Sequence, residues 1–275
     1  MRPGLHFGMC GDDIAATVRF FQQAQIRDLV CDARQIPGRT EKGALDLADL
    51  RAFQQPFAEA GVALGVVTVG SVGRDGEGNA PGADLDRLGQ DIAVLGQAGV
   101  PVAQVFENGS RPEGADPGRY QANVHRSYAQ LAEAGAAADV RLALHGGWWP
   151  GHALWSVASY AALFAAVPDP HLGVSFCAGS FYQSGDDVVA AAHALADRIH
   201  FVHFRDAAGV GGDCPEVLLG TGRVPFRALA AALREIGYDG SVHCEHLGRF
   251  EYQRHGEVVA AWGAGFMRGL FELQG

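Results

Sequence analysis

Short apolar runs rich in β-branched residues alternate with longer alanine-rich stretches along the chain. The runs have the length of buried strands, and the stretches between them repeat their hydrophobic positions with the period of a helix. The runs begin near Leu5, Asp28, Val62, Val102, Arg141, Leu172, Ile199 and Ser241, and the helical stretches span 13–25, 46–60, 84–98, 118–138, 155–166, 186–197, 225–236 and 256–272. Strands that alternate with helices indicate an α/β fold with a parallel sheet.

Eight strand and helix units follow one another without a linker or a break in composition. This arrangement predicts a single (β/α)8 TIM barrel domain over residues 1–275. An open doubly wound sheet is the alternative, but no Gly-x-Gly-x-x-Gly motif follows the first strand, which argues against dinucleotide binding. Glycine-rich segments follow several strands, and the longest (206–222) is a candidate lid.

The formal net charge is −10, and the 21 lysine and arginine residues are scattered. Nucleic acid is therefore not an expected partner, because no basic stripe could neutralise a phosphate backbone. No segment has about 18 uninterrupted apolar residues and no signal-peptide pattern opens the chain, so we expect a cytoplasmic protein without a membrane partner. Five cysteines without CxxC spacing argue against a disulfide framework.

Metal-binding residue types end the last four predicted strands. Because side chains alternate across a strand, one parity faces the lumen of a barrel and the other faces the helices. In each of these strands, the set of alternating positions with small or polar residues is taken to face the lumen. Its last or nearly last member is a metal-binding type: His145, Cys177, His203 and Glu245. All four strand ends lie at the C-terminal face of a barrel, so we expect these side chains to converge there.

Taken singly, each of these residues has a structural explanation, as a hydrogen-bonded histidine or a small buried cysteine. A carboxylate on a core-facing parity is harder to accommodate, because it needs a cation or a proton. Nitrogen, sulfur and oxygen donors together suit Mn, Zn, Fe or Co better than Mg or Ca. The sequence therefore predicts a catalytic divalent metal site, with a closed structural zinc site as the alternative.

Further residues near these strand ends are candidates for catalysis. Arg205 shares the lumen parity of strand seven and is expected to bind a substrate carboxylate, unless it forms an ion pair with Asp206 or another carboxylate at the rim. Tyr182, in the loop predicted after strand six, and His243, on the lumen parity of strand eight, are candidates for proton transfer. Asp206 is expected to contact a ligand imidazole or the candidate lid.

Aromatic residues follow strand five. Trp148 and Trp149 would offer an apolar face to a bound sugar ring, or else close the mouth of the barrel. His200 and His246 fall on the helix-facing parity if their strands are regular. We therefore expect them to orient other residues from outside the site.

Three motifs in the second half of the chain resemble those of the xylose-isomerase-like barrels of sugar isomerases and epimerases, and most of all those of mannonate dehydratase. They are Cys-x-Gly-Ser at 177–180, His-Phe-x-His-x-Arg at 200–205, and the acidic residue followed by histidine at 245–246. Weaker resemblance lies at 20–38 and 84–102. The wider isomerase group usually has an acid where this chain has Cys177, which favours the dehydratase branch.

The resemblance implies that the four predicted donors bind a divalent ion, manganese in that family, and that water is eliminated from a sugar acid such as D-mannonate. Two positions depart from the dehydratase pattern. His145 is followed by Gly-Gly-Trp-Trp-Pro-Gly where the dehydratases have Pro-Asp-Asp-Pro, and Glu245 stands where they have aspartate. These departures bear on which substrate is used.

We therefore expect a metal-dependent carbohydrate lyase whose partner is a small-molecule carbohydrate. A divalent ion would stabilise the charge that develops when a proton leaves carbon, a first step that dehydration and epimerisation share. The alternatives are a metal-dependent sugar isomerase or 3-epimerase, an apurinic-endonuclease-like barrel, which the acidic balance disfavours, and a barrel that has lost catalysis. Assembly into a homo-oligomer also stays open.

Overall fold

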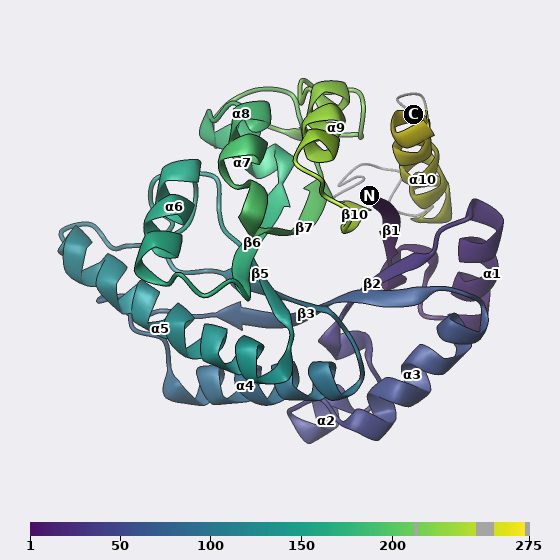
Figure 1. Cartoon of the computed structure of the whole chain (residues 1–275), viewed down its shortest axis with the longest axis horizontal. Coiled ribbons are helices and arrows are strands. Elements are labelled where there is room, and N and C mark those ends of the chain that lie inside the picture. Colours follow the sequence, from purple (N-terminus) through teal and green to yellow (C-terminus); the bar gives the residue numbers. More distant parts are fainter. Residues whose placement is uncertain (212–213, 246–255, 273–275) are drawn as a thin grey trace.

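Eight parallel strands close into a barrel surrounded by helices in the computed structural model, which describes residues 1–211, 214–245 and 256–272 (Figure 1). The barrel strands are β1 (Arg2–His6), β2 (Asp28–Asp32), β3 (Ala63–Val72), β4 (Val102–Glu107), β5 (Arg141–His145), β6 (Leu172–Cys177), β7 (Ile199–Phe204) and β10 (Ser241–Cys244). Neighbouring strands follow chain order, and β10 pairs with β1 to close the ring. The predicted (β/α)8 fold is confirmed.

Helices connect successive strands and cover the outside of the barrel (Figure 1). The α-helices are α1 (Ile14–Ala24), α2 (Arg39–Lys42), α3 (Leu47–Glu59), α4 (Gly82–Gln97), α5 (Pro117–Ala138), α6 (Val157–Ala166), α7 (Ala178–Ser184), α8 (Val188–Ala194), α9 (Phe226–Glu235) and α10 (Gly256–Glu272), and the 3-10 turns are η1 (Phe7–Cys10), η2 (Ala33–Gln35) and η3 (Ala196–Arg198). Within the described ranges, no helix combines the length and the apolar composition needed to cross a bilayer.

Two segments differ from the sequence prediction. The residues directly after β6, predicted as a loop, form α7, which ends where Gly185 takes the left-handed conformation at φ 91°. The helix predicted over 186–197 is shorter, because α8 ends at Ala194 and a separate 3-10 turn leads into β7. The segment that directly follows Cys177 is therefore helical, where the sequence predicted a loop.

Apolar side chains fill the lumen below the mouth. Val30, Val66, Val102, Ala143 and Phe201 form one buried layer inside the barrel. The opposite parity of the strands packs with the helices in a larger apolar core. Because this layer occupies the middle of the lumen, polar groups on the same parity are confined to the two ends of the barrel.

The long segment after β7 is ordered around one carboxylate. It contains a small antiparallel pair, β8 (Asp206–Ala207) and β9 (Glu216–Val217). Asp206 Oδ1 accepts from the backbone N–H groups of Ala207 (2.9 Å) and Val224 (3.2 Å), and Oδ2 accepts from those of Gly220 (2.9 Å) and Gly222 (2.8 Å). Asp206 therefore fixes the base of this segment.

Candidate metal centre

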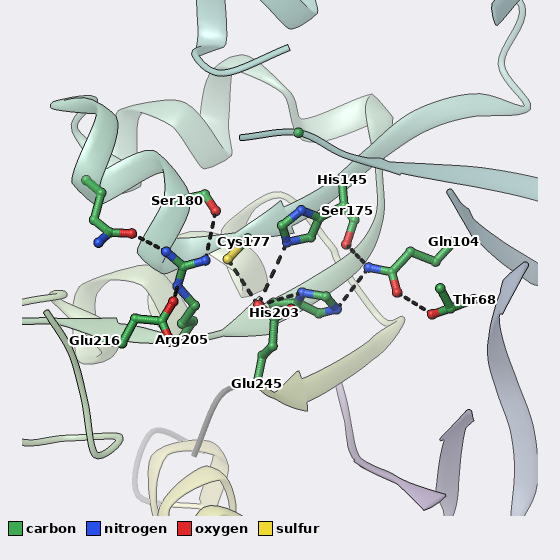
Figure 2. A network of polar contacts seen from close by, with 12 residues as sticks. Thr68, Gln104, His145, Ser175, Cys177, Ser180, His203, Arg205, Glu216 and Glu245 are labelled. Atoms are coloured by element: carbon green, nitrogen blue, oxygen red, sulfur yellow. Dashed lines mark hydrogen bonds and ion pairs between the residues drawn. The ribbon is translucent and has the colours of Figure 1, made fainter. Parts of the chain in front are cut away.

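The four predicted donors lie together at the mouth of the barrel (Figure 2). His145 and Cys177 are the last residues of β5 and β6, His203 lies near the end of β7, and Glu245 directly follows β10. One ligand atom from each residue lies within 4.8 Å of the other three. This is the separation expected of donors that can share one ion.

The Glu245 carboxylate is at the centre of the group. Its Oε2 lies 3.1 Å from His203 Nδ1, 3.4 Å from Cys177 Sγ and 3.8 Å from His145 Nε2. Although Glu245 is past the end of β10, its backbone N–H donates to Phe204 O at 3.0 Å. The ladder with β7 therefore continues for one more residue, which keeps the Glu245 side chain on the lumen parity.

Burial and the close neighbours shift the pKa values of the group in opposite directions. Burial alone would lower the pKa of His145, but Cys177 and Glu245 raise it to about 10. Burial and Glu245 would raise the pKa of the Cys177 thiol, but Arg205 and both imidazoles lower it to about 5. Burial would also raise the pKa of Glu245, but His203 and His145 keep it well below its usual range. The site thus favours two anionic donors held by positive charge.

These residues fit a divalent cation. His145 Nε2 and His203 Nδ1 are buried without a well-formed hydrogen bond and both face Glu245 Oε2, so both nitrogens can bind a cation once they lose their protons. Two anionic side chains as close as Cys177 Sγ and Glu245 Oε2 require shared protons or a cation between them. Imidazole, thiolate and carboxylate suit zinc, manganese, iron or cobalt.

A second row of polar residues supports the group from one side (Figure 2). Gln104 Nε2 lies 3.2 Å from His203 Nε2 and donates to Ser175 Oγ at 3.0 Å, and Gln104 Oε1 accepts from Thr68 Oγ1 at 2.7 Å. The sequence analysis missed Gln104 and Thr68. Extending the parity argument to strand four would have placed Gln104 between two lumen residues, Val102 and Phe106, as a buried amide that needs partners.

A cavity of about 720 Å³ opens beside the donors. His203 and Glu245 line one end, and residues from β1 to β4 line the rest, among them His6, Asp32 and Phe106. His243 also lines it, with its ring centroid 5.4 Å from that of His203. A small molecule would therefore reach the donors from the β1–β4 side.

Three arginines line an adjoining cavity of about 560 Å³: Arg34, Arg39 and Arg87. The two cavities share Asp32, Arg34, Thr68 and Phe106 as lining residues.

Charge in this second cavity is net positive. Arg39 and Arg87 share one buried carboxylate, Asp91, at 2.8 and 3.5 Å from its Oδ2. Arg34 pairs with Asp32 at 2.7 Å. The buried Nε of Arg39 has no hydrogen-bond partner. Three guanidinium groups are paired with two carboxylates here, so this cavity has a local excess of positive charge in a chain of net charge −10, which favours an anion over a cation.

Arg205 lies behind the donors. Its guanidinium donates to Ser180 Oγ at 3.4 Å and to Gln183 Oε1, and Nε lies 3.5 Å from Glu216 Oε1. Its CZ atom is 5.2 Å from the ring centroid of Trp148. Arg205 is 2% exposed and is not among the described residues that line the larger cavity. The Asp206 oxygens contact backbone N–H groups, and the rim carboxylate that lies beside Arg205 is Glu216.

The other predicted residues lie outside the larger cavity as described. Trp148 and Trp149 contact each other and His152 in the segment after β5, with Trp149 39% exposed. Tyr182 lies on α7 and packs against the apolar core. His200 Nδ1 lies 3.0 Å from Leu142 O on a neighbouring part of the sheet. His246 falls outside the described residues.

The sequence profile of a family described as "Xylose isomerase-like TIM barrel" matches residues 25–270. A curated relative, mannonate dehydratase of Brucella canis, is 34% identical over 128 residues, which is 43% of this chain and 32% of that protein. A second, mannonate dehydratase 1 of Agrobacterium fabrum, is 30% identical over 136 residues. The matches span about a third of the length of these relatives.

Solved structures share the fold at low sequence identity. Mannonate dehydratase from Streptococcus suis serotype2 has a TM-score of 0.77 and 17% identity, with 99% of this chain and 94% of that chain covered. An "IOLI protein with a binding zinc atom" also has a TM-score of 0.77, at 14% identity, with 98% of each chain covered. Likeness at these identities establishes the fold alone.

Proposed function

Because this chain belongs to the xylose isomerase-like TIM barrel family, we propose that it is a divalent-metal-dependent enzyme that eliminates water from a sugar acid, as a mannonate dehydratase-like lyase. The observation that carries the proposal is the convergence of His145, Cys177, His203 and Glu245 beside an open cavity. A structural site would not need such an opening. The partial match to mannonate dehydratases supports the choice of reaction.

The four donors would bind the ion, with manganese, zinc, iron and cobalt as the ions to test. When bound, the ion would stabilise negative charge on substrate oxygens as a proton leaves the neighbouring carbon. The position of Arg205 supports a role in holding Cys177 as a thiolate, because the guanidinium lowers the pKa of that thiol. Its N–H groups are engaged by Ser180, Gln183 and Glu216, so we do not assign it to a substrate carboxylate.

Elimination of water requires a group that takes a proton from carbon and a proton for the departing hydroxyl. His243 and His6 both line the cavity, with ring centroids 5.9 Å apart. His6 Nδ1 accepts from the Gly8 N–H at 3.2 Å, so a neutral His6 carries its proton on Nε2 and is a donor there. We assign proton removal to His243, whose imidazolium can then pass that proton to the departing hydroxyl, and we assign to His6 Nε2–H the hydrogen bond that orients this hydroxyl.

The arginine-lined cavity supports an acidic substrate. A sugar acid bound at the donors by its hydroxyl oxygens would extend across β1–β4, where Arg39 and Arg87 would contact its anionic end. We expect Arg87→Met to raise KM for acidic substrates roughly 10–100-fold, the loss associated with a hydrogen bond to a charged group. Arg119→Met is the matched control, because Arg119 pairs with Glu77 and its side chain is 67% exposed. Equal KM values in both variants would argue against an anion site here.

Metal analysis of the purified protein, followed by a mass-resolved screen against aldonates, uronates and ketoses, tests the proposed function. We expect Cys177→Ser and His203→Ala each to lower bound metal and turnover. Cys244→Ser is the matched control, because Cys244 is a buried cysteine on β10 whose pKa burial raises to about 12. Unchanged metal occupancy in both ligand variants would contradict the assignment.

The products distinguish the alternatives. A dehydratase product is lighter than its substrate by one water, whereas an isomerase or epimerase product keeps the same mass. A protein that binds neither metal nor any substrate of the screen would be a non-catalytic barrel. His243→Gln should lower kcat while metal content stays unchanged, which separates proton transfer from metal binding.

A further inference from the structure

We propose that Gln104 is a positioning residue that selects the tautomer of His203 in which Nδ1 can bind the ion. The inference rests on the proposed metal site. Gln104 is 2% exposed on β4, and its amide nitrogen lies 3.2 Å from His203 Nε2, the ring nitrogen that faces away from the other donors (Figure 2). His203 Nδ1 lies 3.1 Å from Glu245 Oε2, on the side of the donors.

The two ring nitrogens of His203 have opposite requirements. To bind an ion, Nδ1 must present a lone pair, so the proton of a neutral imidazole must be on Nε2. A proton on Nε2 requires an acceptor next to it, such as a carbonyl oxygen. In the orientation described, the Gln104 amide presents its NH2 group to Nε2, which suits only an imidazole protonated on Nδ1.

Turning the Gln104 amide by half a turn exchanges Oε1 and Nε2 and leaves the other heavy atoms in place. The turn gives His203 Nε2–H the acceptor that it requires. Oε1 would then accept from His203 Nε2–H and from the Ser175 hydroxyl, and the NH2 group would donate to Thr68 Oγ1. Both hydroxyls can donate or accept, so each keeps its hydrogen bond to the amide after the turn. The two hydroxyls therefore permit the orientation in which Oε1 accepts from His203 Nε2–H and holds the proton there.

This arrangement explains why a buried amide lies at this position. The oxygen of Gln104 would fix the ring orientation of His203 and raise the basicity of Nδ1, as the outer partner of a metal-bound histidine does. Nothing else in the described surroundings of Nε2 is recorded as a hydrogen-bond acceptor for it. Loss of the acceptor should therefore weaken ion binding although Gln104 itself does not contact the ion.

Two substitutions separate this role from packing. Gln104→Met retains the size of the side chain but removes the acceptor, and should weaken cobalt(II) binding by the roughly 10–100-fold that loss of such a partner costs. Gln104→Glu offers only acceptor oxygens, so it should bind cobalt(II) at least as tightly as the unaltered protein. Thr68→Val, which alters the amide's other partner without touching His203, should weaken binding less than Gln104→Met.

The affinities are measured by competition with a chelator of known strength. If Gln104→Glu binds cobalt(II) as weakly as Gln104→Met, the amide NH2 group or packing is what matters, and the inference is wrong. If the unaltered protein binds no cobalt(II), the proposed metal site itself fails, which is a different outcome.

A second measurement does not depend on how well the Gln104 and Thr68 variants fold. Nitrogen-15 NMR of the histidine-labelled, zinc-loaded protein reports which ring nitrogen of His203 carries the proton, with His203→Gln used to assign the signal. We expect the proton on Nε2. A proton on Nδ1, or a metal-bound Nε2, would overturn the proposal.

Discussion

Each end of the barrel lumen buries a carboxylate on the lumen parity. Asp28 lies at the N-terminal ends of the strands, here called the floor, and Glu245 lies at their C-terminal ends, the mouth. At the floor, Asp28 on β2 is 1% exposed and accepts from Arg2 Nε at 2.7 Å, while the Arg2 side chain is 51% exposed. At the mouth, Glu245 is 9% exposed and lies within 3.8 Å of three donor atoms, from His145, Cys177 and His203. The apolar layer around Phe201 separates the two ends.

The pKa values of the two carboxylates shift in opposite directions. Burial raises the pKa of Asp28, because one half-exposed guanidinium does not outweigh the loss of water. Glu245 is also buried, but the imidazoles of His203 and His145 lower its pKa well below the usual range. A buried acid with a guanidinium partner at the surface is thus explained by structure, whereas an acid at the centre of two imidazoles and a thiol that can all bind metal points to an ion.

Among the substitutions considered, loss of the Glu245 carboxylate should have the largest effect, which is on metal binding. Glu245→Gln removes the central anionic oxygen, and we expect stoichiometric metal to be lost, a larger effect than the roughly 10–100-fold of an outer partner. Asp28→Asn makes the same chemical change at the floor and should leave metal content unchanged. Metal analysis of both proteins after dialysis makes the comparison, and equal metal contents would remove the distinction between the two ends.

The apolar layer between the ends should contribute strongly to stability. Phe201 is fully buried, and Phe201→Ala should lower the free energy of unfolding by about 3–5 kcal/mol, the usual cost of deleting a buried aromatic ring. Urea denaturation measures this change. A loss below about 1 kcal/mol would mean that the lumen relaxes around the gap and does not isolate the mouth from the floor.

The smallest of these effects should be a dependence of the free energy of unfolding on pH that comes from Asp28. Its pKa is raised in the folded protein, so the folded state holds this proton more tightly than the unfolded chain does. The stability that this provides is present below the ordinary value of 3.8 and is lost as pH rises through the folded pKa. Asp28→Asn should lack that loss, so its stability relative to the unaltered protein should increase with pH across this range. A difference that does not vary with pH in urea denaturation series would show that Asp28 has an unshifted pKa.

The sequence predicted the fold, and it predicted that four candidate donors would converge at one end of the barrel, because both predictions depend on strong periodic signals. Alternation alone placed His145, Cys177, His203 and Glu245 on the lumen parity, and their meeting at one end follows from barrel geometry. Glu245 lies on the lumen parity because its backbone N–H extends the ladder to β7 beyond the last residue of β10.

The same rule did not predict where Arg205 would lie. β7 ends at Phe204, and the chain then turns into β8, so alternation no longer governs the Arg205 side chain, which faces Ser180 and Gln183 on α7. Tyr182 was expected in a loop, but α7 places it against the apolar core. Such local turns depend on tertiary contacts that periodicity does not contain.

The residues around the candidate metal site were not predicted, for a different reason. Gln104 is a single amide in an apolar strand, and it carries no metal-ligand signal by itself. Thr68 lies next to a shift of register between Thr68 and Gly70 in the β3–β4 pairing, which interrupts the alternation. The arginines of the second cavity come from the segments after β2 and from α4, and only the closed barrel brings them together.

The most direct test of the shared ion is a cobalt(II) titration of the metal-free protein followed by absorption spectroscopy. We predict saturation at one cobalt per chain, with a thiolate-to-cobalt charge-transfer band that is absent in Cys177→Ser. Absence of saturable binding, or an unchanged charge-transfer band in Cys177→Ser, would contradict the account.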